Sequence, residues 1–228
     1  MSAQADTTDP QRNLRSIEAA AIAGIIHSIL LVIALNILLS PPGISASQAD
    51  VSAFYQNDSS PLRGVLAFNL VVFAMIGFIW FVAVIRHRIG EREPRFFATV
   101  FFGAGILYAA MTLIGAASLA APMVLREVGG QAPDPGVAAM TRSFGVVALA
   151  GAVPRVQALI VFSTAALGRI TRTLPAWLVW ISYLFGLALF VTVTFFTPGL
   201  YAFPSWVAVV SLAILVQPRG PSRMRAAV

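Results

Sequence analysis

The chain has 228 residues, of which 58% are apolar and only 11% are charged, and its mean hydropathy is +0.85. Soluble globular domains carry about 25% charged residues, so this composition excludes an ordinary water-soluble domain. The apolar residues form long continuous blocks, whereas the strands of a membrane β-barrel alternate apolar and polar residues. We therefore expect an all-α integral membrane protein, a bundle of about six transmembrane helices in the lipid bilayer.

The formal net charge is +6, and all fifteen basic residues are arginine. Most of them lie at the ends of apolar blocks, which indicates membrane topology rather than nucleic-acid binding. The absence of lysine, with abundant Ala, Val and Gly, is typical of a GC-rich bacterial genome. Because the chain has no cysteine, disulfides and thiolate metal sites are excluded.

The first half of the chain predicts three spans. Residues 1–16 are polar and predict a cytoplasmic tail, and the apolar block 17–39 that follows is long enough to cross a hydrocarbon core of about 30 Å. This block exceeds the apolar core of a signal peptide, although cleavage in the ASQA stretch at 46–49 is the alternative. The remaining expected segments are an external loop at 40–62, a span at 64–85, a charged cytoplasmic turn at 86–95, a span at 96–121 and a second external loop at 122–136.

The second half contains an irregular span. The segment 140–168 carries Pro154 and Arg155 inside an apolar run, and since neither half can span alone, we expect one Pro-kinked helix. A basic turn follows, then spans at 175–197 and 200–216. The last of these is short, so it should tilt, thin the bilayer or re-enter it. Residues 17–217 thus form one six-helix transmembrane domain, followed by a basic cytoplasmic tail at 218–228.

The distribution of arginines predicts an orientation. Eleven of the fifteen lie on the side of the two termini and three on the other side, while Arg155 falls within the bilayer. The positive-inside rule therefore places both termini in the cytoplasm, with the protein in the bacterial plasma membrane. The four tryptophans support this layout, because tryptophan is enriched at membrane–water interfaces. Trp206 falls near an outer helix end, and Trp80, Trp177 and Trp180 fall near inner ends.

Arg155 is the residue most suggestive of a site. An arginine near the membrane midplane costs roughly 2.5 to 17 kcal/mol, and Arg155 is about 20 Å along the helix from both Arg142 and Arg169, so it needs partners. One interpretation is an anion or lipid-headgroup site. The other is a structural arginine that is hydrogen-bonded to carbonyls, to a tyrosine or to Gln157.

Other polar residues lie within the spans. His27 has a depth similar to that of Arg155 and adjoins a stripe of small residues that favours close helix packing; it is either a proton carrier or a hydrogen-bonded structural residue. Asn36 and Asn69 lie at matching depths, which would allow a hydrogen bond between their helices. The candidate ligand or polar-core residues are Arg155, His27, Gln157, Asn36, Asn69, Tyr108 and Tyr183.

Several chemistries are disfavoured by residue type. The two histidines, His27 and His87, lie at different depths, which argues against haem or zinc, and there is no lysine for a retinal Schiff base. Apart from Glu18 at an edge, the spans hold no carboxylate, and no Gly-rich phosphate loop or serine-hydrolase constellation is present. We therefore expect a non-enzymatic protein with no catalytic residues, no metal and no cofactor, and no nucleic-acid partner.

Two segments carry a family resemblance. The stretch RSIEAAAIAGIIHSILLV at 15–32 and the stretch LPAWLVWISYLFGLALF at 174–190, after a basic turn, resemble the DUF4386-like proteins, uncharacterised bacterial multi-pass membrane proteins. The resemblance implies this architecture but supplies no catalytic residues. Our first functional hypothesis is a bundle that binds or moves a lipid, a small anion or a hydrophobic molecule near Arg155. The alternative is a structural or accessory subunit of a larger membrane complex.

Overall fold

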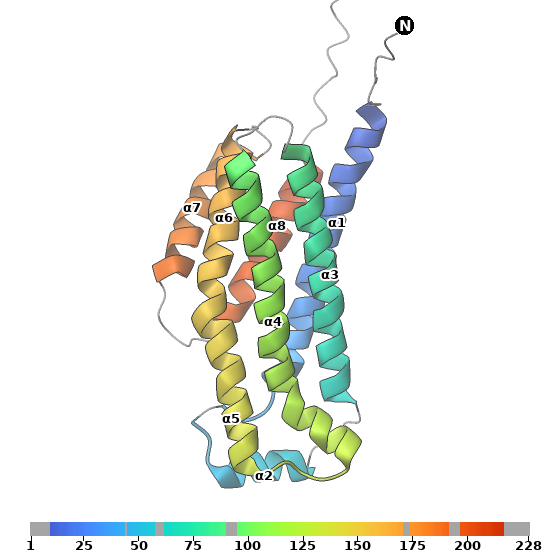
Figure 1. The fold of residues 1–228 in the computed structure, drawn as a ribbon, viewed down its shortest axis with the longest axis vertical. Coiled ribbons are helices and arrows are strands. Elements are labelled where there is room, and N and C mark those ends of the chain that lie inside the picture. The colour runs from blue at the N-terminus through green and yellow to red at the C-terminus, as the bar shows by residue number, and fades with distance from the viewer. Residues whose placement is uncertain are drawn as a thin grey trace, which may run out of the picture.

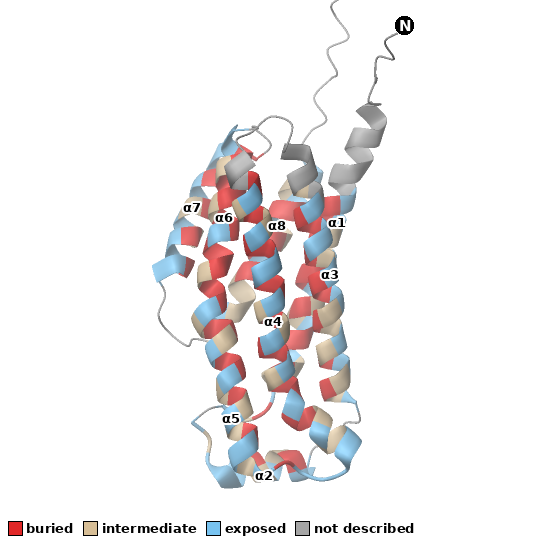
Figure 2. Cartoon of the chain, viewed as in Figure 1, coloured by how far each residue is buried: buried red, intermediate tan, exposed pale blue. Residues whose placement is uncertain are grey.

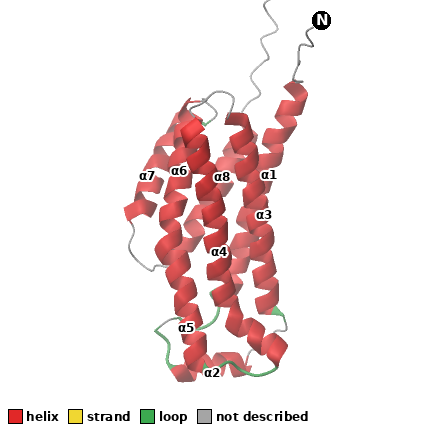
Figure 3. Ribbon diagram, viewed as in Figure 1, coloured by secondary structure: helices red, strands yellow, loops and turns green. Residues whose placement is uncertain are grey.

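The computed structural model describes residues 10–43, 45–57, 62–89, 95–170, 174–191 and 197–216, and these are helical apart from short connections (Figures 1 and 3). No strand occurs among them, which confirms the all-α prediction. Most of the predicted N-terminal tail, the middle of the 86–95 turn and the C-terminal tail lie outside the described residues, as do the side chains of Glu18 and His87.

Six apolar helical segments make up the bundle. Five of them are long and apolar enough to cross a membrane, judged by length and composition, and the sixth is shorter. Their helices are α1 (Pro10–Leu38), α3 (Arg63–Ile89), α4 (Arg95–Gly129), α5 (Pro135–Val146) with η1 (Val147–Ala152) and α6 (Val153–Ile170), α7 (Ala176–Val191), and η2 (Thr197–Tyr201) with α8 (Ala202–Val216).

The last apolar segment is longer than the predicted span 200–216. The 3₁₀ turn η2 adds to α8, so that the last apolar segment has 20 residues, whereas α7 has only 16. At 1.5 Å per residue α7 covers about 24 Å, less than the hydrocarbon core of about 30 Å. Residues 192–196 of the predicted span 175–197 lie outside the described residues, so α7 represents the described part of that span.

The helices pack in a continuous order. α3 contacts α1 and α4, α4 contacts α5 and α6, α6 contacts α7, and α8 contacts α1 (Figure 1). Each helix has a buried stripe facing its neighbours and an exposed face on the outside (Figure 2). The exposed faces carry large apolar side chains such as Phe73, Trp80 and Leu184. Such a surface is unfavourable in water but suits contact with lipid.

A short helix closes one end of the bundle, where the sequence predicted only a loop. Helix α2 (Gln48–Asn57) begins after Ser47, whose hydroxyl accepts from the Asp50 N–H at 3.2 Å while the Asp50 carboxylate accepts from the Ser47 N–H at 3.2 Å. This reciprocal pair is a capping box, which satisfies two otherwise free amide groups. The helix buries Val51 and Tyr55 against Met123 of α4 and Ala138 of α5. We call this end of the molecule the α2 end.

The two helices beside α2 are longer than predicted. α4 continues through Pro122 to Gly129, and its last turns lean away from the rest of the helix in Figure 1, so most of the predicted 122–136 loop is helical. A proline inside a helix removes one hydrogen bond and bends the helix. The helix can nevertheless continue where tertiary contacts hold the residues that follow the proline. The combined α5–η1–α6 segment has 36 residues, about 54 Å, so it extends well beyond a membrane core.

The irregularity expected at Pro154 takes the form of a π-helical segment. η1 ends at Ala152, two residues before Pro154, and the Val153 N–H donates to the carbonyl of Ala148, five residues earlier. Because Pro154 has no N–H, the regular ladder is broken here, and a π turn lets the helix continue without ending. The predicted single helix is thus present from Pro135 to Ile170.

Candidate functional site

Four polar side chains from three helices meet in the middle of the bundle. They are His27 of α1, Tyr108 and Thr112 of α4, and Gln157 of α6, and all are buried. The sequence singled out His27, Tyr108 and Gln157, and the structure brings these three together. The sequence did not single out Thr112, although Thr112 lies four residues after Tyr108 and so shares its helix face. We call these four residues the mid-bundle cluster.

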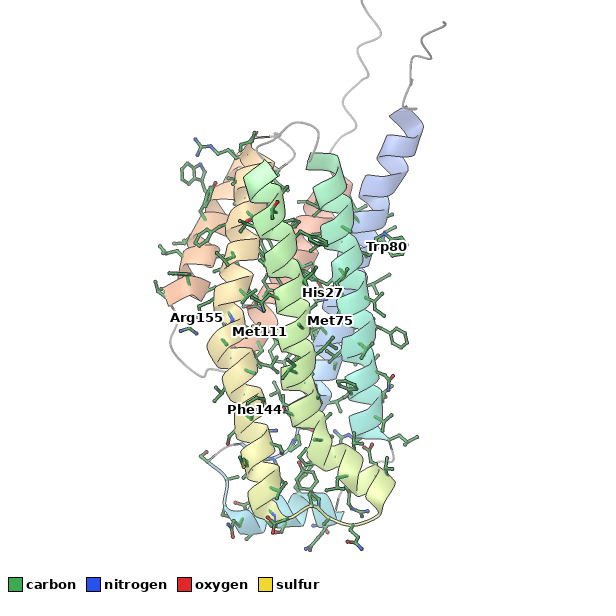
Figure 4. The ribbon with its side chains drawn as sticks, in the orientation of Figure 1. His27, Met75, Trp80, Met111, Phe144 and Arg155 are labelled. Carbon is green, nitrogen blue, oxygen red and sulfur yellow. The ribbon has the colours of Figure 1, made fainter. Side chains whose placement is uncertain are left out.

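His27 is held by helix α3. Its exposed fraction is 0%, and its Nδ1 lies 2.9 Å from the carbonyl oxygen of Ala74. The helices approach closely here because Gly77 has no side chain; a Cβ at that position would lie 3.3 Å from the carbonyl oxygen of Ala23. Figure 4 shows His27 inside the bundle at about mid-height. Since a carbonyl only accepts, Nδ1 carries the proton, and Nε2 is the acceptor in a neutral ring.

The cluster contains buried polar atoms that lack hydrogen-bond partners. They include His27 Nε2, the Tyr108 hydroxyl and Thr112 Oγ1. The Tyr108 hydroxyl lies close to Thr112 and Gln157, but neither pair meets full hydrogen-bond geometry. Unpaired buried polar groups are uncommon in folded proteins and are costly, so a group of them calls for an explanation.

Aromatic rings enclose the cluster. Phe78 of α3 lies with its ring centroid 4.8 Å from that of His27 and 4.7 Å from that of Tyr108. Phe203 of α8 lies 4.9 Å from Tyr108 and 6.0 Å from Phe78. These rings exclude water and lower the local dielectric, which strengthens any hydrogen bond made to the cluster.

The small residues beside His27 form a helix contact, as the sequence suggested. A Cβ on Gly24 would overlap Ser211 Oγ of α8 and lie 3.0 Å from a Phe81 ring carbon of α3. Ser28 bonds within α1, with its hydroxyl donating to the Gly24 carbonyl at 2.9 Å. Helix α1 is therefore packed against two neighbours along this stripe, and its rotation fixes where His27 points.

Arg155 does not belong to the mid-bundle cluster. Its guanidinium donates to the Gly151 carbonyl of its own helix, and Figure 4 shows it on the outer flank of α6, away from His27. Residues two apart on a helix are about 200° apart around the axis, so Arg155 and Gln157 face opposite sides. The structure therefore does not place Arg155 with His27 and Gln157.

The remaining candidates also lie elsewhere. Asn36 and Asn69 are exposed, and each amide donates to a carbonyl of its own helix, of Val32 and of Val65, both at 2.8 Å. The structure thus gives no support to the predicted hydrogen bond between them. Tyr183 is half-buried on α7, with its ring 6.4 Å from that of Phe162.

Trp206 lies near the start of α8 with its ring buried in the bundle. It is only 6% exposed and donates its Nε1–H to Ser182 Oγ of α7 at 3.0 Å. Its ring also packs against Phe203 at 5.8 Å. The tryptophan therefore joins α7 and α8 within the bundle.

Charged residues at 126, 127 and 142 hold the α2 end together, and the sequence had assigned the first two to a loop. The Glu127 carboxylate accepts from the N–H groups of Gly64 and Val65 at 2.6 and 3.2 Å, at the start of α3. Arg126 Nε donates to the Tyr55 carbonyl at 3.0 Å. Arg142, 9% exposed on α5, donates to the carbonyls of Leu38 and Leu39 at the end of α1, both at 3.4 Å. Acids at helix starts and bases at helix ends are both stabilising.

The chain matches no known protein-family model, and comparisons with curated proteins and with solved structures find no match. The resemblance to DUF4386-like proteins therefore stays a prediction. Among the residues that the structure describes, no three His, Cys, Asp or Glu side chains are placed to hold a metal ion. The mid-bundle cluster offers hydrogen-bonding groups in an apolar, aromatic surrounding.

Proposed function

We propose that this multi-pass membrane protein binds a small neutral molecule at the mid-bundle cluster. The observation that carries the proposal is the convergence of unpaired polar atoms of His27, Tyr108 and Thr112, from two different helices, in one buried region. A ligand that pairs with them would recover hydrogen bonds that the protein alone leaves unmade. The apolar rings around them would hold the hydrophobic part of the same molecule.

The hydrogen-bonding pattern indicates the chemical class of this ligand. A buried imidazolium would be costly, and the described residues give His27 no acidic partner, so His27 is neutral and offers Nε2 as an acceptor. The hydroxyls of Tyr108 and Thr112 both donate and accept. An amphiphile with a hydroxyl group fits, because a hydroxyl donates to His27 and accepts from Tyr108 or Thr112. An anion fits this cluster poorly, since no cation belongs to it.

The proposal can be tested with two matched probes on the purified full-length protein. 4-Dodecylphenol carries one hydroxyl and an apolar tail, and dodecylbenzene lacks the hydroxyl. We expect dodecylphenol to raise the melting temperature of the wild type more than dodecylbenzene does. Tyr108→Phe and Thr112→Val each remove one hydroxyl with little change of shape, and each should weaken dodecylphenol binding about fivefold, the loss of one hydrogen bond.

Tyr183→Phe is the matched control, because it removes a hydroxyl on α7 outside the cluster and should leave binding unchanged. If the two probes stabilise all four proteins equally, the mid-bundle cluster is not a hydroxyl-binding site. If neither probe stabilises the protein and it co-purifies in fixed ratio with another membrane protein, it acts as an accessory subunit of a membrane complex.

The proposal includes a bacterial plasma-membrane location with both termini in the cytoplasm, supported by the arginine distribution. Since the chain has no cysteine, single cysteines report topology without background labelling. In intact spheroplasts, a membrane-impermeant maleimide should label Gln56→Cys, at an exposed position of α2, but Ser222→Cys only after lysis. Labelling of Ser222→Cys in intact spheroplasts would place the C-terminus outside the cytoplasm and contradict the proposed orientation.

A further inference from the structure

Helix α7 lies at the edge of the bundle and is joined closely to α6 (Figure 1). A Cβ on Gly186 of α7 would lie 2.8 Å from a ring carbon of Phe162 of α6, so these two helices come close together. Among the described residues, the backbones of α7 and α8 make at most a weak approach, whereas α8 packs closely against α1. The boundary between α7 and α8 is therefore closed by side chains rather than by backbone contact.

Trp206 is the side chain that closes this boundary. It extends from α8 and donates its Nε1–H to Ser182 Oγ of α7 at 3.0 Å, and its ring stacks on that of Phe185 of α7 with centroids 6.3 Å apart. Trp206 is buried, so it fills the space between the two helices. We call the contact of Ser182, Phe185 and Trp206 the α7–α8 seam.

A row of aromatic rings connects the seam to the mid-bundle cluster. The ring of Trp206 lies 5.8 Å from that of Phe203, three residues earlier on α8, and the ring of Phe203 lies 4.9 Å from that of Tyr108. The Tyr108 hydroxyl is one of the unpaired polar atoms of the cluster. Movement of Trp206 and Phe203 away from the bundle would therefore uncover Tyr108 on the side of the seam.

Entry to the cluster requires an opening of this kind. All members of the cluster are buried, so a ligand reaches them only where helices part. Where two helices meet at a glycine, as α1 and α8 do at Gly24, the contact opens only if the whole helices separate. At the seam, rotation of the Trp206 side chain and loss of its hydrogen bond begin the opening.

The outer side of the seam is apolar. Leu184 of α7 and Val209 of α8, close in sequence to the seam residues, are both exposed. An indole that turns outward here meets hydrocarbon instead of water, and no hydrophobic effect drives it back, since lipid tails are as apolar as the interior of the bundle. A molecule dissolved in the bilayer thus meets the seam without passing through water.

We propose that an apolar ligand enters the mid-bundle cluster from the lipid through the α7–α8 seam, with Trp206 as the gate. The gate is closed while the indole donates to Ser182, and it is open when the rings of Trp206 and Phe203 turn away from Tyr108. This inference rests on the function proposed above, because it names the route to the same site. It also specifies the ligand as a molecule that dissolves in the bilayer.

The first measurement requires no ligand. Because the chain has no cysteine, spin labels can be attached to pairs of engineered cysteines in the full-length protein in nanodiscs. Leu184→Cys with Val209→Cys spans the seam, and Ile22→Cys with Leu212→Cys spans the α1–α8 contact as the matched control; all four side chains are exposed. We expect double electron–electron resonance to give a broader distance distribution across the seam. Ser182→Ala should broaden that distribution further and leave the control pair unchanged.

The second measurement follows the exchange of radiolabelled 4-dodecylphenol. Ser182→Ala removes the bond to Trp206, so it should raise the rates of uptake and release about threefold, the loss of one interhelical hydrogen bond in a membrane, and leave the Kd unchanged. Ser182→Cys with Trp206→Cys, joined by a short reducible cross-linker, should lose exchange until the cross-link is reduced. Phe162→Cys with Gly186→Cys, cross-linked in the same way, ties α7 to α6 and should exchange as before.

The outcomes separate this proposal from the function proposed above. If Ser182→Ala leaves both rates unchanged, or if the cross-linked protein, folded by circular dichroism, exchanges dodecylphenol as fast as it does after reduction, the seam is not the route. Equal distance distributions across the seam and across the control contact would show that the seam does not open. If the wild type binds no dodecylphenol, the proposed function fails, and the spin-label distances by themselves decide whether the seam opens.

Discussion

Removal of the Glu127 side chain is expected to loosen the start of helix α3. The first N–H groups of a helix have no partner within the helix, and in α3 two of them, those of Gly64 and Val65, donate to the Glu127 carboxylate. Loss of a capping acceptor costs about 0.5–2 kcal/mol, and loss of a negative charge at a helix start costs about 0.3–1 kcal/mol. We therefore expect Glu127→Ala to reduce the free energy of unfolding by about 2 kcal/mol.

The assay is reversible unfolding in mixed detergent and SDS micelles, followed by circular dichroism. Glu127→Gln keeps one acceptor oxygen and loses the charge, so its effect should be about half as large. Val128→Ala is the control, because the neighbouring Val128 side chain is 74% exposed and should contribute little. If Glu127→Ala lies within about 0.5 kcal/mol of the wild type, the carboxylate does not cap α3 in the folded protein.

Three further predictions concern helix packing. In a double-mutant cycle, Trp206→Phe and Ser182→Ala should show a coupling of about 0.6 kcal/mol, since the indole donates to the serine at 3.0 Å; additive effects would contradict this bond. Gly24→Ala should lower the free energy of unfolding by about 1–3 kcal/mol through overpacking against α8, whereas Gly103→Ala, where a Cβ meets nothing within 4 Å, should be neutral or stabilising. Equal effects of the two glycine substitutions would argue against the close approach. Asn36→Leu should leave the free energy of unfolding in SDS unchanged, because the exposed amide hydrogen-bonds only within α1. A decrease of more than about 1 kcal/mol would instead indicate that Asn36 bonds to another helix.

Part of the candidate site could be predicted from the sequence. His27, Tyr108 and Gln157 stand out as polar residues within apolar blocks, and burial in a membrane bundle requires such residues to find partners. Arg155 was named as a candidate with them, but the structure places it on the outer flank of α6. Because each residue turns a helix by about 100°, Arg155 and Gln157 cannot face the same neighbour.

Errors at the α2 end had a different cause. The Pro-rich and charged stretches there have the composition of loops, yet α2 forms and α4 continues past Pro122. Their helical state depends on contacts with distant parts of the chain, such as the bond from Arg126 to the Tyr55 carbonyl. Local composition does not contain those contacts.

The sequence by itself determined the class of this protein and the approximate position of every apolar helix. The physical reason is that a backbone in lipid must satisfy its hydrogen bonds internally, so that long apolar blocks leave helix as the available structure. Only the tertiary structure decided the rotation of each helix, through contacts such as that of Gly24 with Ser211, and rotation decides which polar side chains meet. It therefore separated His27, turned into the bundle, from Arg155, on the outer flank of α6.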